Sequence, residues 1–303
     1  MENWLEIDLN KLKSNYEYIK KISGSNLCPV VKANAYGLGS IRIAKELVEL
    51  GANIFAVAFL DEAILLRKNG IEKDILVFNY VDLEELSEKY DGKIILTLFS
   101  LEQLKNILNI NIASKIRFHI KINTGMNRLG FDEKDINELC YLIEKYNLKV
   151  EGIYSHFSDV EDENFTRKQH MEFTRVSEII EEKLSKNFVK HISNSAGALK
   201  YKEFNLDFIR CGMGLYGLQP LKIKDENISN VLSWKSKISD LRNLSKGERI
   251  SYGNEEIEED KKIAIVPIGY SHGYIFQNSK NGYVIINGLK ANILGNIFMD
   301  QMI

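Results

Sequence analysis

The sequence has few of the residues that mark a linker-rich or disulfide-bonded protein. It holds 3 prolines and 3 cysteines in 303 residues. Cys28, Cys140 and Cys211 lie far apart, and no cysteine or histidine cluster has the spacing of metal ligands. We therefore expect no Pro-rich linker, no disulfide scaffold and no metal site, and a reducing compartment fits best.

An excess of charge of one sign is also missing. The 40 Lys and Arg residues against 42 Asp and Glu residues leave a net charge of -2, which gives no general reason to bind nucleic acid or an acidic membrane. The longer apolar runs, such as 54–60, are the length of a strand and too short to span a bilayer. The N-terminal segment 1–14 carries charges throughout, unlike a signal peptide. We expect a cytoplasmic protein with neither a nucleic-acid nor a membrane partner.

What the chain does have is an alternation of short apolar runs with amphipathic segments at helical spacing. Eight runs predict strands, at 27–31, 54–58, 75–78, 94–98, 116–122, 150–154, 189–192 and 206–209. Between most of them, helices are predicted at 41–50, 61–68, 83–90, 101–108, 133–146 and 164–184, with Asp61 and Ser100 as N-caps. Eight alternating units predict an α/β fold, a (β/α)8 TIM barrel; an open doubly wound sheet is the alternative.

The pattern changes after Pro220. Strands are predicted at 231–241, 262–267, 283–286 and 291–294, and Asn287-Gly288 between two apolar runs predicts a hairpin. We expect a barrel over residues 1–222 and a mostly β domain over residues 223–303.

Reactive residues follow several of the barrel strands. Lys32 follows the first strand, Ser195 the seventh, and Arg210 the eighth. The last two loops are small-residue turns, which commonly hold a phosphate in such barrels. A phosphate site, a lysine and no metal ligands suggest pyridoxal phosphate as the cofactor.

Eight short motifs, in order, resemble those of the alanine racemase family. They are the segments 30–37 (VVKANAYG), 121–130 (KINTGMNRLG), 155–157 (SHF), 194–196 (NSA), 210–217 (RCGMGLYG), 251–253 (SYG), 268–270 (IGY) and 299–301 (MDQ). The resemblance runs from Trp4 to the end of the chain. It implies a racemase (an isomerase) that is specific for alanine, depends on pyridoxal phosphate and supplies D-alanine for the peptidoglycan of the cell wall in a bacterium.

The resemblance also implies a role for each matching residue. Lys32 would hold the cofactor covalently and serve as one catalytic base, and Tyr252, acting across a homodimer, would be the other. Two bases on opposite faces of Cα suit racemisation, because one removes the proton and the other returns one. The remaining implied roles are phosphate contacts at Tyr36, Ser195, Gly212 and Met213; Arg210 at the pyridine nitrogen, supported by His156; Asn194 beside the phosphate; Arg128, Tyr270 and Met299 at the substrate; and Lys121, carbamylated in many members, orienting Arg128.

The sequence departs from the family pattern in four places. Leu38, Phe298 and Ser271-His272 replace the usual residues, and two of these changes touch the pocket, so serine or lysine racemisation stays open. Family members continue for several strands beyond the last motif, so we expect an incomplete β domain. A truncated, non-catalytic binder of pyridoxal phosphate is a further alternative. A decarboxylase of the same fold fits less well, because such enzymes usually place a carboxylate at the pyridine nitrogen.

Overall fold

A computed structural model describes residues 2–253, 255–279 and 281–303. The chain forms two compact units. One unit is Asp8–Val231, and the other joins the N-terminal residues through Ile7 to Leu232–Ile303. The boundary predicted from the sequence, between residues 222 and 223, precedes the change of unit at Val231.

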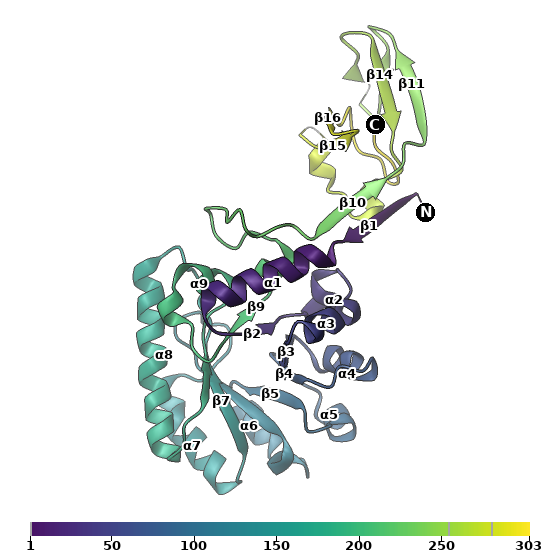
Figure 1. Ribbon diagram of the computed structural model, residues 1–303. Helices are drawn as coiled ribbons and strands as arrows, with labels where there is room; N and C mark the ends of the chain where they lie inside the picture. The colour runs from purple at the N-terminus through teal and green to yellow at the C-terminus, as the bar shows by residue number, and fades with distance from the viewer. Residues whose placement is uncertain (1, 254, 280) are drawn as a thin grey trace. The chain divides into compact units, whose positions relative to one another are not determined.

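The first unit is a parallel barrel, as the sequence predicts (Figure 1). Six neighbouring strands form one parallel sheet in the order β3-β4-β5-β6-β7-β8, and β2 pairs with β9. Single parallel bridges, Val30 to Ala56 and Asn194 to Arg210, connect this pair to both ends of the sheet and close the ring. The strands are β2 (Asn26–Pro29), β3 (Ile54–Val57), β4 (Asp74–Val77), β5 (Ile94–Leu98), β6 (Arg117–Lys121), β7 (Lys149–Tyr154), β8 (Val189–His191) and β9 (Phe208–Cys211).

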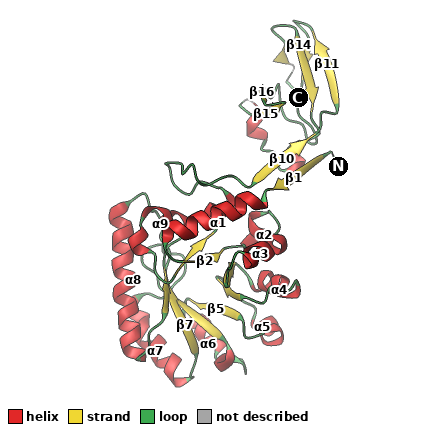
Figure 2. Cartoon of the chain, in the orientation of Figure 1, coloured by secondary structure: helices red, strands yellow, loops and turns green. Residues whose placement is uncertain are grey.

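Helices surround the strands of this unit (Figure 2). They are α1 (Leu9–Ser23), α2 (Lys32–Tyr36), α3 (Ser40–Glu49), α4 (Leu60–Lys68), α5 (Leu83–Lys89), α6 (Leu101–Ile107), α7 (Ile136–Lys145), α8 (Glu163–Leu184) and α9 (Ser195–Lys200), with 3-10 turns η1 (Ala113–Lys115), η2 (Glu133–Asp135), η3 (Lys202–Phe204) and η4 (Met213–Tyr216). The prediction of Asp61 as an N-cap is wrong: α4 begins one residue earlier, after Phe59. None of the described helices is long and apolar enough to cross a membrane.

The side-chain alternation of the strands separates two cores. On β4, Ile75 and Val77 pack outward against the helices, whereas Leu76 packs inside the ring with Ile95 and Phe208. The same period carries polar groups into the ring farther along the strands, where His119 and Lys121 are buried on β6. The barrel interior is therefore polar toward the carboxyl ends of the strands.

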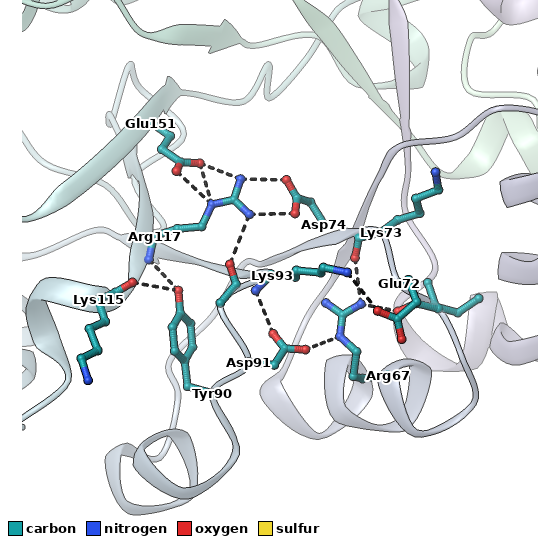
Figure 3. A network of polar contacts seen from close by, with 12 residues as sticks. Arg67, Glu72, Lys73, Asp74, Tyr90, Asp91, Lys93, Lys115, Arg117 and Glu151 are labelled. Carbon is teal, nitrogen blue, oxygen red and sulfur yellow. Dashed lines mark hydrogen bonds and ion pairs between the residues drawn. The ribbon is translucent and has the colours of Figure 1, made fainter.

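A polar network lies around the starts of three barrel strands (Figure 3). Arg117 donates from both terminal nitrogens to Asp74, at 2.7 Å each, and from Nε to both oxygens of Glu151, at 2.8 and 2.9 Å. Its backbone N–H donates to the hydroxyl of Tyr90 at 2.9 Å. This network connects β4, β6 and β7 at the end of the barrel opposite the carboxyl ends of the strands.

The second unit is mostly β. Its strands are β1 (Asn3–Ile7), β10 (Leu232–Ser236), β11 (Asp240–Leu244), β12 (Arg249–Ile250), β13 (Glu255–Glu256), β14 (Lys261–Ile265), β15 (Tyr283–Ile286) and β16 (Leu289–Asn292), with 3-10 turns η5 (Tyr270–His272) and η6 (Phe276–Ser279). They pair antiparallel as β1-β10, β11-β14, β12-β13 and β15-β16. Asn287 and Gly288 have φ of 51° and 81° at the predicted hairpin. The single strand predicted at 231–241 is wrong: it divides into β10 and β11.

Candidate active site

A cavity of about 610 Å³ opens in the barrel unit. Residues that follow different strands line it, as expected where the carboxyl ends of barrel strands meet. Ten of the sequence-predicted residues are among its lining: Lys32, Tyr36, Lys121, Arg128, His156, Asn194, Ser195, Arg210, Gly212 and Met213. The residues picked out at five separate positions in the chain therefore form one site.

Lys32 enters this cavity from an unusual backbone turn. The three residues after it, Ala33, Asn34 and Ala35, have φ of 51°, 54° and 53°, and Tyr36 has φ of 58°. The turn is left-handed and closed by backbone bonds from Ala35 N to Val31 O and from Gly37 N to Ala33 O, at 2.9 Å each. Since Cβ disfavours this conformation, the surrounding structure must hold the turn in place.

Arg210, at 3% exposure, is a buried cation of the barrel interior. Its terminal nitrogens donate to the Nδ1 atoms of His191, at 2.7 Å, and His156, at 3.0 Å, and to three backbone carbonyls. All five of these bonds come from the two terminal nitrogens, and Arg210 lines the cavity. Burial lowers the pKa of Arg210 to about 10.

The histidines around Arg210 are neutral. Burial first, and the Arg210 charge second, holds the pKa of His156 and of His191 well below the usual value. If Nδ1 of His191 accepts from Arg210, its Nε2 carries the proton and donates to Nδ1 of His119, 2.9 Å away. A chain of neutral imidazoles therefore fixes the direction of the guanidinium without a carboxylate.

Two small-residue turns form another wall of the cavity. Ser195 begins α9, and its Oγ accepts from the backbone N–H groups of Gly212 at 3.1 Å and Gly214 at 3.3 Å. A Cβ on Gly212 would lie 2.4 Å from the hydroxyl oxygen of Tyr36, so only glycine leaves room for that hydroxyl. These contacts bring the two turns together and place the hydroxyls of Ser195 and Tyr36 on the same wall of the cavity, where an anion can be held.

A tight loop after β6 carries Arg128. Asn123 Oδ1 accepts from the N–H groups of Gly125, at 3.2 Å, and Asn127, at 3.0 Å. A Cβ on Gly130 would lie 2.6 Å from the backbone nitrogen of Asn123, so the loop can close only over glycine. The glycines of the sequence motif are thus explained by the loop that presents Arg128.

Lys121 lies on the cavity wall with 6% exposure. Its ammonium lies 5.7 Å from the ring centre of Tyr154, which stacks on His191. Burial, followed by the charges of Arg128, Arg210 and Lys32, lowers the pKa of Lys121 to about 8. In the described part of the chain, neither Lys121 nor Arg210 forms a salt bridge. Four cationic side chains and two acidic ones, Asp159 and Glu161, therefore line one cavity, and the excess of positive charge favours an anionic ligand.

Tyr252, Tyr270 and Met299 belong to the other unit and are not among the residues that line this cavity. They are exposed by 72%, 48% and 62%, respectively. The rings of Tyr252 and Phe298 are 5.1 Å apart, and Tyr270 N donates to Phe298 O at 3.1 Å. The three predicted residues thus share one exposed surface of the β unit.

Three residues that support the site were not singled out from the sequence. His191 accepts from Arg210, Tyr154 lies against Lys121, and Glu62 binds the N–H of Ala33. His191 and Tyr154 lie within predicted strands, and because every second residue of a strand faces the same side, counting in steps of two could have placed them inside the ring. Over the described ranges, no group of three or more His, Cys, Asp or Glu side chains could hold a metal ion.

Comparison with known proteins identifies the class and then the family. Residues 7–220 match the family described as "Alanine racemase, N-terminal domain", and residues 231–303 match "Alanine racemase, C-terminal domain". An "Alanine racemase" of Methanococcus maripaludis is 38% identical over 310 residues, which cover 98% of this chain and 83% of the relative. "Alanine racemase 1" of Bacillus subtilis is 37% identical over 309 residues, covering 99% of this chain and 79% of the relative.

Comparison with solved structures gives the same family. The alanine racemase of Clostridium difficile 630 superposes with a TM-score of 0.91 at 32% identity and covers 100% of this chain and 82% of that one. An alanine racemase from E. faecalis gives a TM-score of 0.90 at 30% identity, covering 99% of this chain and 84% of that one. The protein is therefore an amino-acid racemase, an isomerase with a barrel and a mostly β domain. The chain belongs to the alanine racemase family.

Proposed function

We propose that the protein interconverts L- and D-alanine with bound pyridoxal phosphate, by a two-base mechanism that uses Lys32 and the partner subunit's Tyr252. The observation that carries the proposal is the cavity itself. The cavity brings together Lys32, the turns at Ser195 and Gly212, and Arg210, which has no carboxylate partner within the described ranges. In a bacterial cytoplasm the product would supply D-alanine for peptidoglycan.

The residues present fit pyridoxal phosphate. Tyr36, Ser195, Gly212 and Met213 line the wall that would hold the phosphate, with Asn194 beside it. Lys32 would hold the cofactor covalently. When bound, the cofactor delocalises the charge left after the Cα proton is removed.

Arg210 would set the electronic state of the cofactor. Its neutral histidine and carbonyl partners leave the guanidinium charged, and a cation beside the pyridine nitrogen disfavours protonation of that nitrogen. Arg210 would thereby limit how strongly the bound cofactor stabilises charge at Cα, which would suppress side reactions. His156 would hold the guanidinium in place.

The substrate carboxylate would meet Arg128 in the barrel, with Tyr270 and Met299 of the partner subunit. Lys121 would orient Arg128 as a carbamate, because the amine of a lysine whose pKa is near 8 is partly neutral and can add carbon dioxide with loss of a proton. The exposed surface shared by Tyr252, Tyr270 and Met299 supports a homodimer in which each β unit completes the site of the other subunit.

The alanine assignment has support in one solved structure that covers nearly all of this chain. The alanine racemase of Bacillus anthracis, 29% identical with a TM-score of 0.86, was solved "with bound L-Ala-P".

The test is isotope exchange. The protein with added pyridoxal phosphate is incubated in heavy water with each enantiomer of alanine, serine and lysine. We expect deuterium at Cα together with inversion for alanine. Lys32→Ala should abolish both, whereas Tyr252→Phe should still exchange D-alanine but without inversion. Inversion of serine or lysine in preference to alanine would reassign the substrate. Retained cofactor with no exchange in any amino acid would contradict the proposal.

A further inference from the structure

A side chain of the neighbouring helix α4 accepts a hydrogen bond from the turn that presents Lys32. Ala33 N donates to Oε1 of Glu62 at 2.5 Å. Among the described residues, Glu62 is the only side chain of another helix that hydrogen-bonds to residues 32–37. Ala33 directly follows Lys32, so this contact lies one peptide from the lysine.

The other oxygen of Glu62 is engaged elsewhere. Oε2 accepts from Ala58 N at 2.7 Å and from Phe59 N at 3.1 Å, where α4 begins. The two oxygens therefore serve different elements: one caps α4 and the other holds the left-handed turn. This division distinguishes Glu62 from an ordinary capping residue, whose contacts stay within its own helix.

Because the turn is strained, its conformation depends on contacts such as that between Glu62 and Ala33. Four consecutive non-glycine residues, 33–36, have positive φ, a conformation that a chain keeps only where its surroundings impose it. Release of Ala33 N–H would let the peptide between Lys32 and Ala33 rotate, and the direction of the lysine side chain would change with it.

We infer that Glu62 is a positioning residue that holds the left-handed turn and thereby aims the Lys32 amine into the cavity. The inference rests on the proposed function only in assigning cofactor attachment to Lys32. Its structural part concerns the turn alone and can be measured without cofactor.

The decisive variant is Glu62→Gln. A glutamine has one acceptor oxygen, which can serve either the α4 cap or Ala33 but not both. Asp82→Asn is the matched control. Asp82 caps α5 through one oxygen, Oδ1, which accepts from both Glu84 N and Glu85 N, so the single amide oxygen of asparagine can replace it.

The first readout is hydrogen exchange of cofactor-free protein, followed by mass spectrometry of the peptide that spans residues 31–38. We expect at least tenfold faster exchange there in Glu62→Gln, and no change in Asp82→Asn. Glu62→Asp, with a shorter side chain that cannot reach Ala33, should give the same increase. It replaces Glu62→Gln if that variant does not fold.

The second readout is covalent attachment of pyridoxal phosphate to Lys32, trapped by borohydride and located by mass. Attachment should be about tenfold slower in the Glu62 variants and unchanged in Asp82→Asn. Wild-type exchange and wild-type attachment in a folded Glu62 variant would overturn the inference. Failure of attachment in the wild type would instead contradict the proposed function, and the exchange readout would still decide the role of Glu62.

Discussion

Lys121 and Arg210 are buried cations whose placement should lower the stability of the fold. Both are nearly inaccessible, and no carboxylate of the described chain pairs with either. An unpaired buried cation destabilises a fold unless a ligand supplies the opposing charge. Arg210 is compensated in part by its histidine and carbonyl acceptors, whereas the compensating contact of Lys121 in the described part of the chain is the face of Tyr154. Lys121 is therefore the residue at which the cost should be measurable.

We predict that Lys121→Met stabilises the cofactor-free protein at pH 7 by about 3 kcal/mol, from a pKa lowered from 10.5 to about 8. Below pH 8 the amine is charged in both the folded and the unfolded state, so the wild type bears the full cost of burying the charge. Between pH 8 and 10.5 only the unfolded state still holds the proton, and wild-type stability rises with pH relative to the variant. Urea unfolding in buffers free of carbon dioxide measures the difference.

The control for this prediction is Lys68→Met, at an exposed position of α4. Its stability should follow that of the wild type at every pH. A difference between wild type and Lys121→Met that stays constant from pH 7 to 10.5 would contradict the titration of Lys121.

At the scale of elements, hydrophobic periodicity was sufficient to predict the barrel strands but not the N-terminal segment that precedes them. All eight predicted strands form, because each buried strand carries an apolar run of the right length. The helix α1 and the strand β1 were not predicted. The segment 9–23 is rich in lysine and asparagine, and β1 has a mixed burial pattern and finds its partner, β10, far along the chain. Pairing at such a distance leaves no local signal.

The left-handed turn after Lys32 was beyond sequence reasoning for a different reason. Positive φ is expected of glycine or asparagine, and the segment 33–36 includes two alanines and a tyrosine. The conformation is imposed by contacts from α4 and β3, which no local pattern reveals.

The strain in this element can be measured by relieving it. We predict that Ala33→Gly stabilises the protein by about 0.5–1 kcal/mol. Removing the left-handed penalty of an alanine, about 1–2 kcal/mol, outweighs the added freedom of glycine in the unfolded chain. Ala33 is exposed, so no packing is lost. Thermal and urea unfolding measure the change.

Glu88→Gly, at an exposed position of the right-handed helix α5, is the opposing control, and it should lose about 1 kcal/mol. A loss of stability in both variants would show that the turn is not strained in solution.

At the scale of the whole molecule, the sequence predicted which residues line the barrel cavity better than it predicted which residues hold them in place. Ten predicted residues meet in one cavity because the carboxyl ends of barrel strands converge, whichever residues separate them in the chain. The supporting contacts of His191 and Glu62 depend on which side chains face each other across strands and helices. The joining of Tyr252 to this site through a second subunit stays a prediction.

The opposite end of the barrel should contribute stability without chemistry. Arg117 connects β4 and β7 there through two carboxylates, with a side-chain exposure of 23% (Figure 3). We predict that Asp74→Asn lowers the free energy of unfolding by about 1–2 kcal/mol, because the asparagine cannot match two charge-assisted bonds and Arg117 remains partly buried. Racemisation and cofactor attachment should stay within twofold of wild type, since the cavity lies at the other end of the strands.

The control for this prediction is an exposed ion pair on the same unit. Glu138 meets Lys105 at 2.7 Å, with about half of each side chain exposed, and such pairs contribute little. Glu138→Gln should therefore change stability by less than about 0.5 kcal/mol. If Asp74→Asn behaved like Glu138→Gln, the Arg117 network would not stabilise the fold. If Asp74→Asn slowed cofactor attachment while the fold kept its stability, the two ends of the barrel would be coupled, and chemistry would not be confined to the carboxyl ends of the strands.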